Sequence, residues 1–227
     1  ALVDHKLKEL DYKLAVSHEV EFIGYNHPDG KRTYLRSLCF VLQNAVRRIY
    51  PDKVLIINHS LPSGLYCTIC EKEPLEDGRR AVHELDDNAL AELKEEMRNI
   101  VSADLPFTKV KMEAAAAEEL FLANGQPDKA AHLKSLGVLI CSVYYLDGQA
   151  DTFHGPLLPS TGYLKVFDLM PYGEGFCLQF PSDNDFNKVI PVRKQSRIAS
   201  TLKDYADWCS IIGVNGIGTL NKAVLAG

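Results

Sequence analysis

The chain has 227 residues, of which 46% are hydrophobic and 24% are charged, and its formal net charge is −5 at pH 7. This composition is typical of a globular protein, and the length suffices for one large or two small domains with a buried core. The acidic balance argues against a general affinity for nucleic acid. No apolar run reaches the ~18 residues of a membrane span, and the charged N-terminus lacks the apolar core of a signal peptide. We therefore expect a cytoplasmic protein with no membrane association.

The first part of the chain alternates short strands with amphipathic helices. Residues 19–25 have the composition of a strand, and the turn-forming residues 26–31 follow them. Across residues 33–49, apolar side chains recur three and four positions apart, which predicts a helix with one buried face. Two runs rich in β-branched and aromatic residues, 53–60 and 64–71, flank a Leu-Pro-Ser-Gly turn and predict a hairpin.

The rest of the chain continues this mixture of elements. The patterns predict a helix with Asp86 or Asp87 as its cap, and then the following strands and helices: strand 107–112, helices 113–125 and 127–137, strands 138–148, 163–172 and 175–184, and helices 196–213 and 218–227. Strands and helices are intermixed with several hairpins, which favours an α+β fold over a doubly wound parallel sheet. The polar run 192–197 separates the last helices from the rest.

Short catalytic signatures are missing from the sequence. There is no phosphate-binding loop, no nucleophile elbow and no pair of histidines four residues apart. The stretch most like a functional loop is Thr-Phe-His-Gly-Pro-Leu-Leu-Pro-Ser-Thr-Gly, residues 152–162, which contains His154. A lone histidine does not make a metal site, because three or four ligands must converge. The residues on their own therefore predict neither a catalytic centre nor a metal site.

Several runs of the sequence resemble a known family in their order and spacing. The runs 35–69, 90–112 and 151–169 resemble, in this order, the editing-type second domain of threonyl-tRNA synthetases. The opening residues resemble the end of the ubiquitin-like TGS domain that precedes it in those proteins. The resemblance implies that residues 1–27 end a TGS-like β-grasp unit and that residues 28–191 form an editing-like domain. The implied fold is an antiparallel sheet with packed helices, a short β-rich N-terminal piece and a helical C-terminal segment.

The same resemblance implies where a hydrolytic site would lie. In that family, a His-x-x-x-His helix and a Cys-x-x-x-His loop converge to hydrolyse mischarged tRNA. This chain has Arg36 and Phe40 at the helix positions and Phe153 and Leu157 at the loop positions. None of these side chains is a metal ligand or a proton carrier near neutral pH. We therefore expect a degenerate site without catalytic residues or metal, formed by Arg36, Phe40, Asp151, Phe153, His154 and Leu157.

Three runs also resemble the N-terminal region of bacterial uridine kinase-like nucleoside kinases, namely 32–52, 57–67 and 205–227. This second resemblance implies a parent protein that phosphorylates a nucleoside with ATP and Mg²⁺. Residues 192–227 would then be a helical linker leading towards a kinase domain of the same polypeptide. No cofactor is expected in the present chain.

Several functions are compatible with these patterns. The main hypothesis is a non-catalytic accessory, regulatory or ligand-binding module, with a nucleoside or nucleotide bound near Arg36, Asp151 and His154. Alternatively, Phe40, Phe153 and Leu157 have filled the former cleft with core. Two further alternatives are an editing-type hydrolase with a rebuilt site that depends on His154, and an RNA-binding module. Whether the chain is an enzyme stays open.

Overall fold

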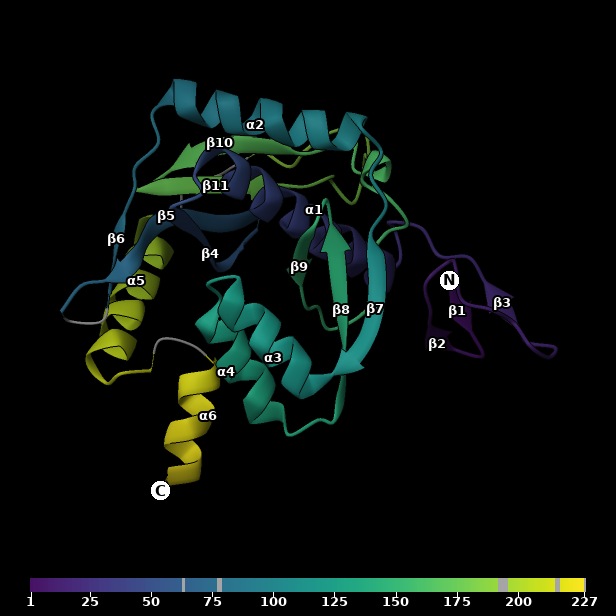
Figure 1. Ribbon diagram of the computed structural model, residues 1–227. Helices are drawn as coiled ribbons and strands as arrows, with labels where there is room; N and C mark the ends of the chain where they lie inside the picture. Colours follow the sequence, from purple (N-terminus) through teal and green to yellow (C-terminus); the bar gives the residue numbers. More distant parts are fainter. Residues whose placement is uncertain (63, 77–78, 192–195, 215–216, 227) are drawn as a thin grey trace.

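Helix α1 (Pro28–Ile49) runs through the middle of the computed structural model, which describes residues 1–227 apart from 63, 77–78, 192–195, 215–216 and 227 (Figure 1). The predicted turn at 26–31 is confirmed only at its start, because residues 25–27 form a turn and residues 28–31 already belong to the helix. The Nδ1 atom of His27 accepts a hydrogen bond from the Asp29 N–H at 3.2 Å, and Pro28 occupies the first helical position, where no N–H is needed. Gly30 is required here, since a Cβ atom would lie 1.9 Å from the Gly24 carbonyl oxygen.

The larger sheet has five strands and is antiparallel throughout. Their order is β10 (Asp168–Tyr172), β11 (Gly175–Gln179), β5 (Gly64–Pro74) and β4 (Lys53–Leu61), with β6 (Arg80–Val82) also paired to β5. The hairpin of β4 and β5 is confirmed, with Lys53 opposite Glu71. Strand β10 is shorter than predicted: Tyr163 belongs to a 3₁₀ turn (Thr161–Tyr163), and residues 164–167 form neither helix nor strand.

A smaller antiparallel sheet lies on the other side of α1. It consists of β7 (Thr108–Glu113), β8 (Ile140–Leu146) and β9 (Gln149–Asp151). Helices α3 (Ala114–Ala123) and α4 (Pro127–Leu136) pack against each other beside it, over a small apolar cluster that includes Phe121, Leu133 and Val143. Loop 152–162 leaves the end of β9, so this sheet fixes where the loop starts.

The main core lies between α1, α2 (Asp87–Ser102) and the larger sheet. Asp86 caps α2 by accepting a hydrogen bond from the Ala89 N–H at 2.8 Å, which confirms one of the two predicted caps. The apolar faces predicted for α1 and α2 are buried here, with side chains that include Leu38, Leu42, Leu93, Met97 and Ile100. The α+β class with antiparallel sheets and packed helices is thus confirmed.

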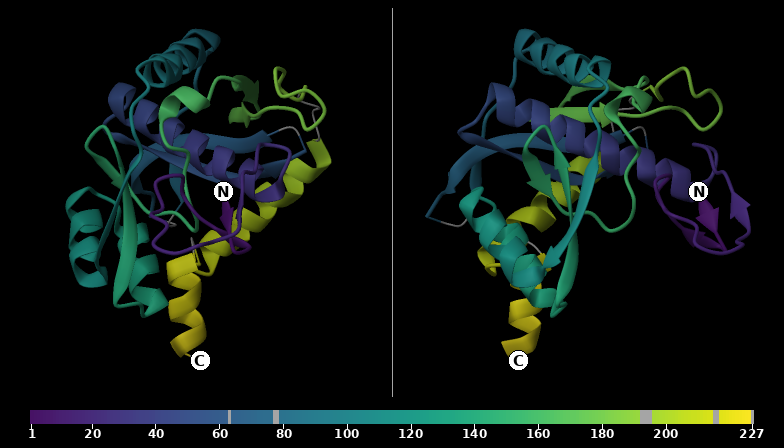
Figure 2. Two further views of the ribbon diagram at one scale, coloured as in Figure 1. Left: turned by 90° about the vertical axis from the view of Figure 1, so that its right-hand side faces the viewer. Right: turned by 45° about the vertical axis from the view of Figure 1, so that its right-hand side comes forward.

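The two ends of the chain form smaller elements beside this body (Figure 2). Three two-residue strands, β1 (Leu2–Val3), β2 (Lys6–Leu7) and β3 (Val20–Glu21), make a small N-terminal sheet, so the strand expected over 19–25 is much shorter than predicted. At the other end are α5 (Ser196–Ile211) and α6 (Ile217–Ala226), and α6 packs on α4. The predicted joint at 192–197 falls largely outside the described residues. None of the helices in the described part of the chain combines the length and apolar character needed to cross a membrane.

Candidate functional site

Loop 152–162 is tied directly to α1. The Arg36 guanidinium donates two hydrogen bonds to the Pro156 carbonyl oxygen, from Nε at 3.2 Å and from Nη2 at 3.1 Å. The Ser37 hydroxyl accepts one from the Leu158 N–H at 2.9 Å. Gly155 has φ +119, and a Cβ atom there would lie 3.0 Å from the centre of the guanidinium. The loop therefore needs a glycine for its backbone conformation and for the close approach of Arg36.

The structure brings together the helix and loop positions that the resemblance singled out, and apolar side chains occupy three of them. Phe40 is 1% exposed and Leu157 is 4% exposed, and both belong to the main core. The ring of Phe153 lies 5.2 Å from that of Phe40, measured between centroids. Phe107 and Tyr144 add further ring contacts to this group. We call Phe40, Phe153 and Leu157 the apolar plug, because they fill the space between α1 and the loop.

Asp151 is the last residue of β9, directly before the loop, and forms a buried ion pair. Its side chain is 4% exposed, and its Oδ1 atom lies 2.5 Å from the Nζ atom of Lys129 on α4. The same oxygen accepts a hydrogen bond from the Thr152 N–H at 2.6 Å. Burial lowers the pKa of Lys129, while the neighbouring Asp151 carboxylate opposes this shift. The pair places a proton-carrying amine and a carboxylate next to the loop.

Lys129 was missed by the sequence analysis, and so was Arg47 on α1. The Arg47 guanidinium donates to the Gln149 Oε1 atom at 2.7 Å, and burial lowers the pKa of Arg47 while Asp151 raises it. Both residues are cations on amphipathic helices, where a lysine or arginine is most often a solvated surface group. No local pattern distinguishes them from the other lysines and arginines of the chain.

His154 does not enter the apolar plug. Its side chain is exposed, and its ring contacts that of His132 on α4, with centroids 5.8 Å apart. Within the described ranges, no three histidine, cysteine, aspartate or glutamate side chains converge as metal ligands.

Cys39 precedes Phe40 on α1 and is the thiol nearest to this region in sequence. Burial, with a smaller contribution from Asp151, raises the pKa of Cys39 to about 12. The sulfur is therefore a neutral thiol at physiological pH and not an activated nucleophile.

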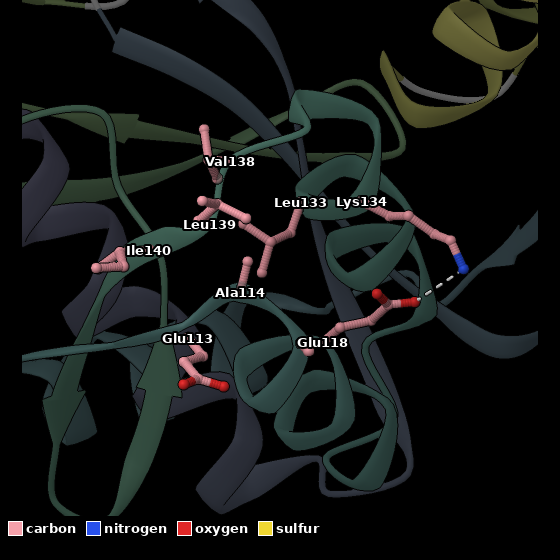
Figure 3. A pocket seen from close by; sticks show the side chains of 9 residues that line it. Glu113, Ala114, Glu118, Leu133, Lys134, Val138, Leu139 and Ile140 are labelled. Atoms are coloured by element: carbon pink, nitrogen blue, oxygen red, sulfur yellow. Dashed lines mark ion pairs between the residues drawn. The ribbon is translucent and has the colours of Figure 1, made fainter.

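A groove of about 580 Å³ lies away from the loop (Figure 3). The start of α3, the end of α4 and residues 138–140 line it, with Leu133 and Leu139 on its apolar walls and Glu113 near one end. Lys134 and Glu118 form an ion pair of 3.5 Å at its other side. None of the six predicted site residues lines this groove, so its shape says nothing about the loop.

The α+β fold, with antiparallel sheets and packed helices, is consistent with an editing-like domain of threonyl-tRNA synthetases, and the chain is homologous to part of threonine–tRNA ligases. It is 30% identical over 169 residues to the threonine–tRNA ligase of Desulforamulus reducens, a match that covers 74% of this chain and 25% of the relative. The enzyme of Halorhodospira halophila is 29% identical over 168 residues, and threonine–tRNA ligase 2 of Bacillus subtilis is 27% identical over 168, with the same coverage. The chain spans about a quarter of the length of these curated relatives. No protein-family model matches it.

These relatives correct one prediction. Assignment to a uridine kinase-like nucleoside kinase, and thus to the transferases, is not supported, because the relatives found are threonine–tRNA ligases. That assignment depended on short runs, two of them helical, and an amphipathic helix pattern is shared by many unrelated proteins. The ATP, the Mg²⁺ and the kinase domain that it implied lose their basis with it.

Proposed function

We propose that this chain is an editing-like accessory module of a protein related to threonine–tRNA ligases, which keeps the scaffold of the hydrolytic site without its chemistry. The observation that carries this proposal is the apolar plug. Side chains of Phe40, Phe153 and Leu157 stand where the resemblance requires imidazole and thiol groups, and Phe40 and Leu157 are almost completely buried. Aromatic and aliphatic side chains neither polarise an ester carbonyl nor accept a proton from water.

Arg36 occupies the fourth of the positions that the resemblance singled out, and its hydrogen bonds support the same proposal. Two of its N–H groups are committed to the Pro156 carbonyl oxygen, and a third bond from Nη2 reaches the Thr33 hydroxyl at 3.2 Å. An arginine remains protonated and so cannot serve as a general base. Arg36 therefore holds the loop in place, and ligand binding through this guanidinium would have to replace those bonds.

A second candidate function rests on the Lys129–Asp151 pair and on the identity of the relatives. In this alternative the chain is an editing-type hydrolase with a rebuilt site. A deprotonated Lys129 would take a proton from a water that attacks the aminoacyl ester, and the tRNA hydroxyl would leave with a proton. The lowered pKa of Lys129 favours the neutral amine that this step needs. The buried ion pair with Asp151 opposes it.

A deacylation assay separates the two functions. The tRNA for threonine is charged either with serine or with threonine. Each aminoacyl-tRNA is incubated separately with the wild-type chain, with each of the variants Lys129→Met, Asp151→Asn and His154→Ala, and with a bacterial threonine–tRNA ligase as the positive control. The accessory module predicts ester loss at the uncatalysed rate for every form of the chain. Hydrolysis by the wild type that Lys129→Met or His154→Ala abolishes would overturn it and establish the rebuilt hydrolase.

A further inference from the structure

Glu9 joins the N-terminal segment to the smaller sheet at the edge of loop 152–162. Its two carboxylate oxygens lie 3.1 and 2.9 Å from the Nζ atom of Lys109, and the Tyr144 hydroxyl donates a further hydrogen bond to Oε1. The Glu9 side chain is 21% exposed. One carboxylate is thus held by an ammonium and a phenol from parts of the chain far from it in sequence.

The two receiving groups are fixed in position by the sheet. Lys109 on β7 and Tyr144 on β8 are directly opposite each other across the two strands. The Lys109 ammonium lies 5.4 Å from the centroid of the Tyr144 ring, and the tyrosine is 2% exposed. Because the two residues stand on paired strands, their backbone positions stay adjacent whether or not Glu9 is present.

The receiving groups also border the loop. The Tyr144 hydroxyl lies 3.3 Å from the Gly155 carbonyl oxygen, and its ring packs edge-on against Phe153. Burial and the Glu9 carboxylate raise the pKa of Tyr144, whereas the nearby Arg36 lowers it. The phenol therefore stays a protonated donor near neutral pH, and Arg36 adds positive charge beside it.

The segment that carries Glu9 has little else to hold it. Leu10, Leu14 and Val16 are 57%, 51% and 71% exposed, and the hydrogen bonds described for residues 8–17 other than those of Glu9 stay within the N-terminal piece. Residues 10–17 are all exposed, and the hydrogen bonds described between residues 8–17 and the body are those of the Glu9 carboxylate. Such an attachment is open to competition by another anion.

We propose that Lys109 and Tyr144 form an oxyanion-binding subsite at the edge of loop 152–162, which takes a carboxylate or phosphate group of a ligand and which Glu9 occupies as an internal competitor. An ammonium and a phenol that point at one oxyanion are the donors expected of such a subsite. While Glu9 occupies the subsite, only a small fraction of the molecules can bind an external anion there. The apparent affinity for that anion is reduced in proportion to this fraction. This inference does not depend on whether the chain hydrolyses esters.

Removal of Glu9 tests the subsite. Inorganic phosphate and acetate are titrated separately into the full chain and into Glu9→Ala at constant ionic strength, with binding followed by the NMR signals of β7 and β8. We expect Glu9→Ala to bind at least one of the two anions about tenfold more tightly than the wild type, since the Glu9 carboxylate no longer competes for the Lys109 ammonium and the Tyr144 hydroxyl. The anion that binds more tightly identifies the ligand group as phosphate or carboxylate. Equal affinities of wild type and Glu9→Ala for both anions would overturn the proposal.

A matched pair of variants separates a built subsite from general electrostatics. In the Glu9→Ala background, Lys109→Ala should abolish the gain in anion affinity, and Tyr144→Phe should reduce it. Lys111→Ala removes the same charge from an exposed position two residues along β7 and should leave the gain intact. Equal losses for the two lysines would show a diffuse charge effect and would count against the subsite.

A proteolysis experiment on the wild type covers the case in which Glu9→Ala fails to fold. Phosphate and acetate should each be compared with chloride at equal ionic strength. An anion that binds the subsite should release the segment and raise the rate of cleavage within residues 10–16. Cleavage that responds to ionic strength alone would mean that Glu9 is only a tether.

Discussion

The surroundings of loop 152–162 are buried in two opposite ways, at an apolar end beside α1 and at a charged end beside α4. Towards α1, the loop packs through the apolar plug, whose side chains need no partner other than one another. Towards α4, Asp151 is buried as a charge and depends on Lys129. Each buried apolar group adds to the stability of the fold. A buried ion pair adds little by itself, but removing one partner lowers the stability because the other charge is left buried without a partner. The apolar end is therefore part of the core, and the charged end keeps a buried pair that constrains its surroundings.

The largest effect is expected at the apolar end. Phe40→Ala should lower the free energy of unfolding by about 3 to 5 kcal/mol, because it leaves a cavity among fully buried side chains. Urea denaturation followed by circular dichroism measures this loss. Leu139→Ala, at a side chain that is 87% exposed, is the control and should change stability by no more than about 0.5 kcal/mol. A loss below about 1 kcal/mol for Phe40→Ala would mean that the plug is loosely packed and that the cleft can open.

At the charged end, the two partners should not be equivalent. Lys129→Met leaves the Asp151 carboxylate buried with only the Thr152 N–H as donor, and should cost about 2 to 3 kcal/mol. Asp151→Asn leaves a lysine that is 32% exposed and can turn towards water, and should cost about 1 to 2 kcal/mol. The same denaturation measurement compares them. Equal losses of stability, or a larger loss for Asp151→Asn, would contradict the expectation that the buried carboxylate depends more on the ion pair than the lysine does.

The sequence predicted the elements whose signal is local. The hairpin of β4 and β5 and the buried faces of α1 and α2 follow from apolar spacing and turn residues over short windows. Strands β6 and β9, with three residues each, are too short for an alternating pattern to be visible. The first turn of α1 was taken for a loop because Pro28, Asp29 and Gly30 have turn-like composition, although proline is well suited to a helix start.

For the candidate site, the resemblance singled out residues that lie close together in the fold, but it could not give their packing. Arg36, Phe40, Phe153 and Leu157 do lie between α1 and the loop, and only the structure gives the exposure of Phe40 and Leu157 that distinguishes a filled space from an open one. The partnership of Lys129 with Asp151 depends on how α4 docks beside β9. No pattern within either segment encodes that contact.

A further test uses Cys39, which precedes Phe40 on α1, to ask whether water reaches α1 beside the apolar plug. Its pKa is about 12 in the folded chain against the ordinary value of 9.0. Between these two pH values the unfolded chain releases a proton that the folded chain retains, so stability falls as pH rises, by up to about 1.4 kcal/mol per pH unit. Below pH 9 the thiol is protonated in both states and contributes no slope.

Cys39→Ala should therefore lose stability less steeply than the wild type between pH 9 and pH 11, as measured by denaturation at each pH. Other buried groups with raised pKa values, such as Tyr34 at about 12 and Cys177 at about 11, are present in both chains, so the difference in slope isolates Cys39. Parallel slopes would show that the pKa of Cys39 is not raised in the folded chain and that water reaches this thiol beside the apolar plug.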